Sequence, residues 1–246
     1  MQRIFHTPEG VRDIYSQECS RKQKLQEKLH RVFHQYGFED IETPTFEYFE
    51  VFSKEVGTIP SRELYKFFDR EGNTLVLRPD FTPSVSRACA TYFNPEKEVV
   101  SLCYTGNTFI NNSSFRGRLK ETTQMGVERM GDDSPEADAE ILAMTVECLL
   151  ATGLTEFQVS VGQVDYYKAI FAQTGLSQEE EEELRELISQ KNYFGVEELV
   201  KNKNMDKSLA RVLSQLPQMF GSTEVLEKAK SLTDNPQALK AVARLE

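Results

Sequence analysis

Residues 64–87, LYKFFDREGNTLVLRPDFTPSVSR, decide the fold class of this chain of 246 residues. Their first half predicts two strands joined by a hairpin turn at residues 70–73, where a polar stretch with a glycine separates two apolar runs. Pro79 and Pro83 bracket a turn that leads straight into a helix over about residues 82–93. Neighbouring strands with tight connections predict an α+β fold built on an antiparallel sheet, not the regular strand–helix alternation of a doubly wound sheet.

The same mixture of strands and helices continues on both sides of this stretch. A helix is predicted over residues 16–36, with Ser16 as its cap and Gly37 as the left-handed residue after its end. Ser134, followed by a proline and a glutamate, predicts the start of another helix that stops at Gly153. The other predicted elements are strands over residues 38–44, 99–109, 119–130 and 156–164.

The strand-like runs disappear after about residue 166, and only helical patterns remain. The sequence therefore predicts two domains, a mixed core over residues 1–165 and an all-helical region over residues 166–246. The helices of the second region are predicted near residues 165–173, 177–191, 195–202, 206–216, 223–232 and 235–246.

The composition excludes several classes of protein. The chain has 29 Lys and Arg against 39 Asp and Glu, a formal net charge of −10, so the chain as a whole is not an electrostatic nucleic-acid binder. It has no apolar run long enough for a membrane span. The four cysteines form no CxxC pair, and the N-terminal residues do not resemble a signal peptide, so we expect a cytoplasmic protein with reduced thiols.

Residues 119–129 carry the most informative polar pattern, because side chains alternate between the two faces of a strand. Gly126 lies between Gln124 and Glu128 on one face and leaves space above the strand, as in the floor of a polar pocket. The alternative is an ordinary solvent-facing strand surface, which is also polar. The predicted apolar face consists of Leu119, Met125 and Val127, and the polar face of Thr122, Gln124, Gly126 and Glu128.

Two further segments carry candidate binding residues. Asp80 and Thr82 lie where a predicted strand passes into a helix, so they either cap that helix or face a ligand that bears an ammonium group. The loop Phe115-Arg116-Gly117-Arg118 either clamps an anion, with Arg118 as a contact, or is a solvated hairpin tip.

The sequence predicts neither a metal site nor a cofactor. His30 and His34 are four residues apart on the first predicted helix, but no third ligand is near in sequence, so this pattern favours surface residues. His6 is remote from both. The chain has no P-loop, GxGxxG, GxSxG or HExxH motif.

Several longer motifs carry a resemblance to a known family. The motifs are TPEGVRDI (7–14), YGFEDIETPTFE (36–47), the stretch at 64–87, CYTGNTF (103–109) and GRLKETTQMGVERMG (117–131). These motifs, in this order, resemble those of proteins with the histidyl-tRNA synthetase-like class II fold, and the resemblance covers about residues 4–165. The form PDFTPSVSR resembles the regulatory subunits of ATP phosphoribosyltransferase more than a synthetase, where Pro-Glu-Gly-Thr is expected.

The resemblance implies a role for each candidate residue. In the synthetases, the positions of Asp80 and Thr82 hold the α-amino group of histidine. The position of Gln124 helps to hold that amino group, and the position of Glu128 reads the imidazole. The resemblance thus implies a histidine-binding pocket where the alternation of residues 119–129 suggests a polar one.

Two departures from the synthetase pattern point to lost catalysis. Ile110 stands where motif 2 of the class II enzymes has an arginine that holds the α-phosphate of ATP, and Asn112 stands where a glutamate contacts adenine. Isoleucine cannot stabilise charge on a phosphate. The Gly-Leu-Asp-Tyr-Tyr-like and Gly-Gly-Arg-Tyr-Asp-like segments and motif 3 of the family are also not found, so we expect a truncated form or a fragment with a pocket open on one side.

The resemblance implies a non-catalytic regulatory subunit of ATP phosphoribosyltransferase, the enzyme that catalyses the first step of histidine biosynthesis. Its expected partner is the short-form catalytic subunit, its effector is histidine, and it forms a homodimer within a hetero-oligomer. No cofactor, nucleic acid or membrane is expected. One alternative is a catalytic fragment of a histidyl-tRNA synthetase that activates histidine with ATP, and another is a degenerate paralogue that serves only as an interaction surface.

Overall fold

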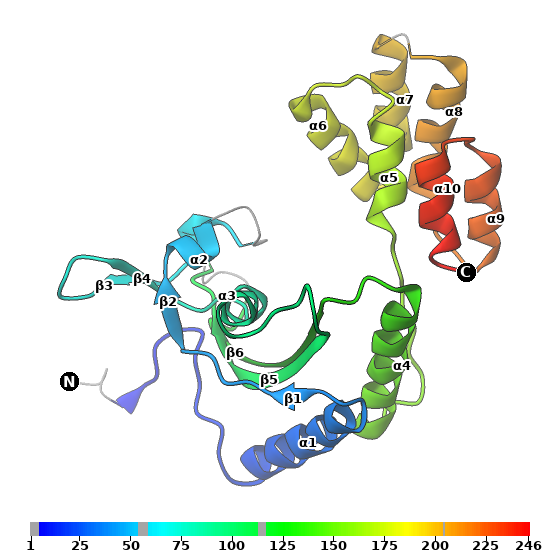
Figure 1. The fold of residues 1–246 in the computed structure, drawn as a ribbon. Helices are drawn as coiled ribbons and strands as arrows, with labels where there is room; N and C mark the ends of the chain where they lie inside the picture. Colours follow the sequence, from blue (N-terminus) through cyan, green and yellow to red (C-terminus); the bar gives the residue numbers. More distant parts are fainter. Residues whose placement is uncertain (1–4, 54–58, 113–116, 204) are drawn as a thin grey trace. The chain divides into compact units, whose positions relative to one another are not determined.

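The computed structural model describes residues 5–53, 59–112, 117–203 and 205–246. The chain divides into two compact units, Met1–Phe157 and Gln158–Glu246, whereas the sequence places the domain boundary after residue 165. The first unit mixes strands and helices and the second contains helices only, in its described residues (Figure 1). None of the helices in the described part of the chain is long and apolar enough to cross a bilayer.

The larger sheet of the first unit contains β1 (Glu39–Asp40), β5 (Val100–Phe109) and β6 (Glu121–Met130), in the order β1-β5-β6. The long strands β5 and β6 are antiparallel in continuous register, so that Tyr104 lies opposite Gly126. The long pair is antiparallel as the sequence predicts, and only the short strand β1 departs from this arrangement, because it is parallel to β5.

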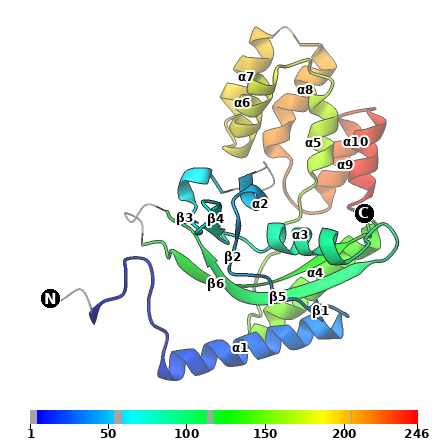
Figure 2. The ribbon, with the colours of Figure 1, turned by 60° about the vertical axis from the view of Figure 1, so that its left-hand side comes forward.

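Helices cover both faces of this sheet (Figures 1 and 2). Helices α1 (Ser16–Gln35) and α4 (Pro135–Thr152) pack on one face. Helix α3 (Thr82–Tyr92) packs on the other face. The core on the first face contains Val32, Phe33, Phe38, Cys103 and Met144, and the core on the second contains Phe81, Val85, Cys89, Val100, Leu102 and Tyr104.

A second, smaller sheet is antiparallel in the order β2-β4-β3, and the β3–β4 hairpin confirms the turn predicted at residues 70–73. Gly72 has φ +88° in this turn, a conformation that suits glycine. Phe52, Leu64 and Val76 form the core beside this sheet. Its elements and neighbours are β2 (Phe46–Tyr48), α2 (Glu50–Ser53), η2 (Ser61–Glu63), β3 (Lys66–Phe68) and β4 (Thr74–Leu77).

The ends of the long helices follow the sequence with one exception. The side chain of Ser134 accepts a hydrogen bond from the backbone N–H of Ala137, and Gly153 ends α4 with φ +99°, as predicted. The predicted cap at Ser16 is wrong, because Ser16 is the first residue of α1 and the preceding Tyr15 makes no side-chain cap. Ser16 has φ +50°, whereas an N-cap residue typically has extended backbone dihedral angles.

The strand predicted over residues 156–164 is also wrong. Residues 156–163 form neither a helix nor a strand, and Val164 begins α5. Val159 and Val161 are 37% and 53% exposed. Apolar alternation marks a strand only where a neighbouring strand completes the hydrogen-bond ladder, and none of the described strands pairs with this segment.

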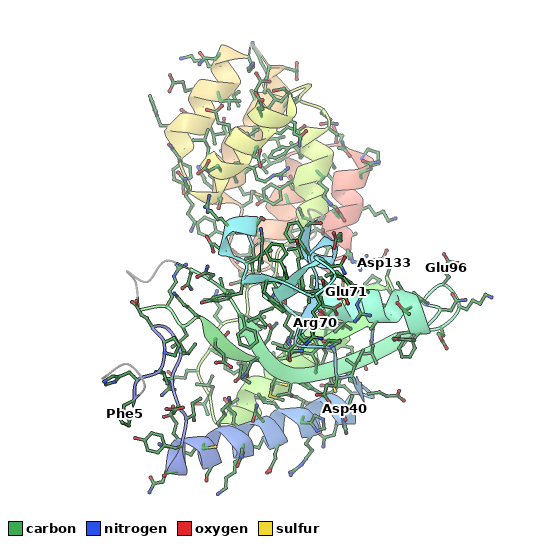
Figure 3. All side chains as sticks on the ribbon, turned by 90° about the vertical axis from the view of Figure 1, so that its left-hand side faces the viewer. Phe5, Asp40, Arg70, Glu71, Glu96 and Asp133 are labelled. Atoms are coloured by element: carbon green, nitrogen blue, oxygen red, sulfur yellow. The ribbon has the colours of Figure 1, made fainter. Side chains whose placement is uncertain are left out.

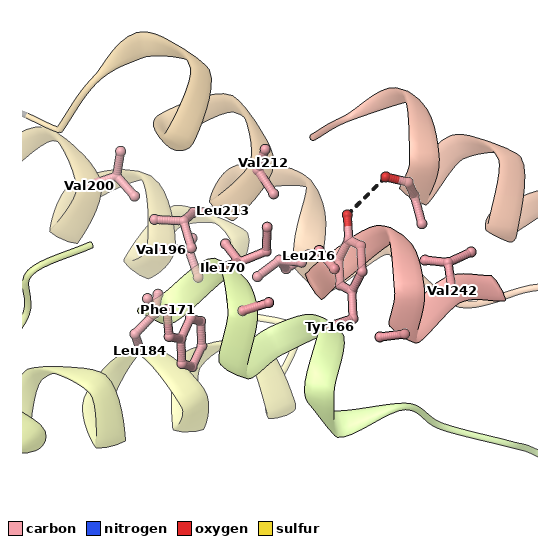
Figure 4. Close-up of a cluster of buried hydrophobic side chains, with 14 residues drawn as sticks. Tyr166, Ile170, Phe171, Leu184, Val196, Val200, Val212, Leu213, Leu216 and Val242 are labelled. Atoms are coloured by element: carbon pink, nitrogen blue, oxygen red, sulfur yellow. Dashed lines mark hydrogen bonds between the residues drawn. The ribbon is translucent and has the colours of Figure 1, made fainter. Parts of the chain in front are cut away.

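The second unit is a set of short helices around one core (Figure 4). Ile170, Leu184 and Leu213 are fully buried in this core. The hydroxyl of Tyr166 donates a hydrogen bond of 3.0 Å to the carbonyl of Ala229. The elements are α5 (Val164–Phe171), α6 (Gln178–Ser189), α7 (Tyr193–Asn202), α8 (Lys207–Gln215), η4 (Leu216–Gln218), α9 (Glu224–Ser231) and α10 (Pro236–Ala243), and each helix predicted after residue 165 has a counterpart among them.

Candidate functional site

The four candidate residues from the sequence meet between the start of α3 and the face of β6. Thr82, the first residue of α3, donates a hydrogen bond of 2.7 Å from its hydroxyl to Glu128 Oε1. Gln124 Nε2 donates to Asp80 Oδ1 at 3.4 Å. One residue of the β4–α3 connection and the first residue of α3 therefore contact two residues of β6, although more than forty positions separate them in the chain.

Asp80 also makes a local bond. Its Oδ1 accepts a hydrogen bond of 2.7 Å from the backbone N–H of Phe81, beside the start of α3. Thr82 makes no such bond to the helix, because its hydroxyl points to Glu128. The sequence leaves open whether Asp80 and Thr82 bond to the backbone at the helix start or face a ligand. Asp80 does bond to the local backbone and also contacts Gln124, whereas the Thr82 hydroxyl bonds to Glu128 and not to that backbone.

Tyr104 joins this group, and sequence reasoning missed it. Its hydroxyl accepts a hydrogen bond of 3.4 Å from Gln124 Nε2 and donates to Glu128 Oε1 at 3.5 Å. Its ring stacks on Phe81, with centroids 4.3 Å apart and an interplanar angle of 9°. The signal was present in the alternation of β5, but only the register of β5 against β6 shows that Tyr104 faces Gly126.

The expected open space above Gly126 is therefore filled. A Cβ atom added to Gly126 would lie 2.4 Å from the Tyr104 hydroxyl. The glycine is needed because the phenol of the opposite residue crosses the strand at this point. On the polar face of β6 the Tyr104 hydroxyl therefore lies between Gln124 and Glu128 and contacts both.

Arg78 anchors the connection that carries Asp80, and sequence reasoning did not assign it a role. Its side chain is buried, and its Nη1 donates to the carbonyl of Thr43 at 2.8 Å. Its Nε donates to the carbonyl of Asn107 at 2.9 Å. Its guanidinium also lies over the Phe81 ring at 4.0 Å, and burial lowers its pKa. These contacts tie the end of β4 to β5 and so hold Asp80 in place.

The site carries negative charge in a partly buried position. Burial raises the pKa of Glu128, the hydrogen bond from Thr82 opposes this shift, and the charge of Asp80 raises the pKa further. Burial and the same two carboxylates raise the pKa of Tyr104, which therefore stays a neutral phenol. Among the described residues neither Asp80 nor Glu128 forms a salt bridge. The arrangement suits a small ligand with a positive group and N–H donors.

The other predicted residues lie outside this group. Arg118 is exposed and takes no part in the hydrogen bonds that join the four residues. Phe115 and Arg116, the rest of the proposed clamp, lie outside the described residues. Met125 and Val127 pack under α1 and α4 as predicted, but Leu119 precedes β6 and is 44% exposed, so its place on the apolar face is wrong.

A histidyl-tRNA synthetase family model matches residues 10–246, nearly the whole chain. The chain belongs to the histidyl-tRNA synthetase family. Its first unit has the class II aminoacyl-tRNA synthetase-like α+β fold, as the motifs predict. The chain resembles histidyl-tRNA synthetase of a Nostoc species in fold alone, at 20% identity and a TM-score of 0.76 over 98% of this chain and 56% of that one.

Relatives within the family are more specific. The chain is 41% identical to an ATP phosphoribosyltransferase regulatory subunit of Acetivibrio thermocellus and 39% identical to one of Ruminiclostridium cellulolyticum, over 98% of this chain in both cases. The chain spans 58% of the length of each of these relatives. A crystal structure of an ATP phosphoribosyltransferase regulatory subunit/histidyl-tRNA synthetase from Bacillus halodurans C matches all of this chain and 63% of that one, with 30% identity and a TM-score of 0.88.

Ile110 and Asn112, the residues compared with motif 2 in the sequence, lie at the end of the β5–β6 hairpin. Ile110 follows β5, and its backbone N–H donates to the carbonyl of Lys120 at 2.9 Å. Asn112 Nδ2 donates to the carbonyl of Leu119 at 3.4 Å, and its Oδ1 is buried without a hydrogen-bond partner. Both residues therefore close the end of the β5–β6 hairpin with backbone contacts, and neither offers a charged group to a nucleotide.

Proposed function

We propose that this chain acts as the histidine-sensing part of a non-catalytic regulatory subunit of ATP phosphoribosyltransferase. The observation that carries the proposal is the contact of Thr82 and Asp80 with Glu128 and Gln124 across α3 and β6. The relatives named as such regulatory subunits support the assignment, since they match almost all of this chain.

Free histidine suits this pocket in charge and in hydrogen bonding. The carboxylate of Asp80 and the amide oxygen of Gln124 are acceptors for the α-ammonium group. The carboxylate of Glu128 accepts a hydrogen bond from an imidazole N–H, while Thr82 holds that carboxylate in position. An amino acid without a side-chain N–H would leave Glu128 with only the hydroxyl donors of Thr82 and Tyr104, and a partly buried carboxylate that lacks a further donor is costly.

The same geometry disfavours activation of histidine by ATP. Adenylate formation needs preorganised positive groups at the α-phosphate, and the loss of one such donor slows a reaction by about 10²–10³-fold. Ile110 supplies none at the motif-2 position. In this proposal the amino-acid pocket is retained and the nucleotide chemistry is lost.

The proposed partner is the short-form catalytic subunit, in an assembly of homodimers of this chain with that subunit. Histidine in the pocket would favour one state of the assembly and so change the partner's activity, because an effector shifts an equilibrium by its difference in affinity for the two states. The proposed location is the cytoplasm, and the four cysteines, which are all free thiols, fit a reducing compartment.

Calorimetric titration with histidine tests the pocket. We expect saturable binding to the wild-type chain, and binding weakened by roughly 10- to 150-fold in Asp80→Asn, because a hydrogen bond to a charged group contributes about 1.5–3 kcal/mol. The matched control is Glu71→Gln, which removes an exposed carboxylate in the β3–β4 turn and should leave the affinity unchanged. Wild-type affinity in Asp80→Asn would refute the pocket, and the absence of any heat with histidine would favour a pure interaction surface.

Two further assays separate the regulatory role from the synthetase alternative. Co-purification with a short-form catalytic subunit, whose activity then falls on addition of histidine, is the expected result. Histidine-dependent exchange of pyrophosphate with ATP is the result expected of a synthetase fragment. Detectable exchange by the isolated chain would overturn the proposal.

A further inference from the structure

A cluster of potential metal ligands lies on the opposite face of the sheet from the histidine pocket. His30, His34, Asp40 and Cys103 place one ligand atom each within 4.8 Å of one another. Asp40 lies at the α1 side of the sheet (Figure 3). The cluster shares no residue with the network of Asp80, which faces α3, so a ligand here would be separate from histidine.

Regular elements position all four side chains. His30 and His34 are one turn apart on α1 and so lie on the same face of the helix. Gly37, with φ +78°, reverses the chain after α1 and lets β1 begin two residues later. Asp40 is the register partner of Cys103 in the parallel pair of β1 and β5. Strand pairing and helix periodicity together create the cluster, which spacing in the sequence alone does not show.

The four residues already contact one another. His30 Nε2 lies 2.5 Å from Asp40 Oδ1, and His34 Nε2 lies 3.0 Å from Asp40 Oδ2. The thiol of Cys103 donates to Asp40 Oδ1 at 3.5 Å. The thiol is buried, whereas the side chains of His30, His34 and Asp40 are 39%, 46% and 58% exposed. An ion can therefore reach the two histidines and Asp40 from solvent, and the thiol of Cys103 lies on the buried side of the cluster.

We propose that His30, His34, Asp40 and Cys103 form a binding site for one divalent transition-metal ion, with Zn²⁺ as the preferred ion. Two imidazole nitrogens, one carboxylate oxygen and one thiolate are a donor set for Zn²⁺, whereas Mg²⁺ and Ca²⁺ require oxygen ligands. Tetrahedral Zn²⁺ with bonds of about 2.0–2.3 Å holds its ligand atoms about 3.3–3.8 Å apart. The hydrogen-bonded atoms of the cluster are 2.5, 3.0 and 3.5 Å apart, and all four ligand atoms lie within 4.8 Å of one another, so adjustments of the side chains alone can reach this range.

Metal binding exchanges the thiol proton of Cys103 for the ion, and the charges of the resulting complex balance. Coordination by Cys103 releases the thiol proton to solvent, and each imidazole binds through Nε2 with its remaining proton on Nδ1. The thiolate and the carboxylate then contribute two negative charges, which neutralise the two positive charges of the ion. The metal would replace hydrogen bonds to Asp40 as the link between α1, β1 and β5.

Titration of the chelator-treated full chain with Co²⁺ tests this site directly. We expect saturation at one equivalent, with a thiolate-to-cobalt charge-transfer band in the near ultraviolet and the strong visible bands of four-coordinate cobalt. Added Zn²⁺ should displace the cobalt and bleach these bands. Zn²⁺ should also raise the midpoint of thermal unfolding, because it binds the folded state.

Matched variants assign the ligands. Cys103→Ser should lose the charge-transfer band, and His34→Gln should weaken cobalt binding by at least about 10- to 100-fold, the cost of losing even an outer-sphere partner of a metal site. His6→Gln and Cys19→Ser remove the same residue types outside the cluster and should bind as the wild type does. If circular dichroism shows that Cys103→Ser does not fold, the exposed ligand His34 decides the question.

Three outcomes would overturn the proposal. The first is a wild-type titration without a thiolate band. The second is unchanged binding in His34→Gln, and the third is an equal loss in His6→Gln or Cys19→Ser. Asp80 lies outside the cluster, so Asp80→Asn should leave the cobalt spectrum unchanged. The proposed metal site and the proposed histidine site are therefore tested independently of each other.

Discussion

Glu128 is held between two opposing influences. Burial and the nearby Asp80 favour its protonated form, while the hydroxyl of Thr82 favours the carboxylate. The net result is a pKa raised above the usual value of 4.5. The ligand-free protein therefore keeps this carboxylate at a cost in stability, which a cationic or N–H-bearing ligand would offset.

Glu128→Gln should bind histidine roughly 10- to 150-fold more weakly and yet be the more stable protein at neutral pH. Because the folded-state pKa of Glu128 is raised, its contribution to stability is fully present below about the unfolded value of 4.5 and is lost as the pH rises through the folded-state pKa. The amide does not titrate, so the stability difference between variant and wild type should grow with pH over this window. Denaturant midpoints at a series of pH values measure it, and a difference that is flat or shrinks with pH would contradict the assignment.

Gly126→Ala should destabilise the first unit by about 1–3 kcal/mol, since its methyl group would overlap the Tyr104 hydroxyl, whose ring is held against Phe81. The matched control is Gly162→Ala, where an added Cβ meets no atom within 4 Å, and a change within about 0.5 kcal/mol is expected. Denaturant unfolding measures both. Equal effects of the two substitutions would show that Tyr104 does not fill the space above β6.

The residues of the candidate site were partly predictable from the sequence. Alternation along residues 119–129 placed Gln124 and Glu128 on one face, and the structure brings them to Asp80 and Thr82. Tyr104 was not predictable, because its role depends on register between two strands, which a single sequence does not encode locally. The metal-ligand cluster depends in the same way on the pairing of Asp40 with Cys103.

At the scale of elements, local chemistry predicted helix ends well where a cap was present. Helix α4 begins after Ser134 and ends at Gly153, as expected from these residue types. The prediction failed at residues 156–164, where alternation without a partner strand forms no ladder. Helix signals are contained within the segment itself, whereas a strand requires a second segment, and this difference explains which predictions held.

The capping box at the start of α6 offers a test at this scale. The Ser177 hydroxyl accepts a hydrogen bond from the backbone N–H of Glu180, and the Glu180 carboxylate accepts one from the backbone N–H of Ser177. Ser177→Ala should therefore lower the stability of the second unit by about 1 kcal/mol. Thr223→Ala is the control, because Thr223 precedes α9 without a side-chain cap and should be nearly neutral. Thermal unfolding followed by circular dichroism compares them, and a larger loss in Thr223→Ala would contradict the capping argument.

At the scale of the whole molecule, the second unit has a core of its own. Fourteen buried residues from α5 to α10 form a single cluster, and the buried bond from Tyr166 to Ala229 links the first of these helices to α9. The change from mixed to helical patterns near residue 166 indicated this division, and the unit boundary after Phe157 precedes it because the unpaired segment at 158–163 groups with the helices.

Residues 158–246 expressed alone should fold into a helical domain with a cooperative thermal transition, since their apolar side chains already bury one another. Circular dichroism of the fragment measures the helix content and the transition. A broad, non-cooperative melt, or a spectrum of an unfolded chain, would show that this core depends on residues 1–157.

Cys103 and Tyr104 are consecutive residues of β5 whose side chains emerge on opposite faces, one toward α1 and the other toward α3. A single inserted or deleted residue near the start of this strand would exchange the two, turning the sulfur toward Glu128 and the phenol toward His34. A one-residue shift of β5 would therefore disrupt the cluster around Asp40 and the hydrogen bonds to Glu128 at the same time.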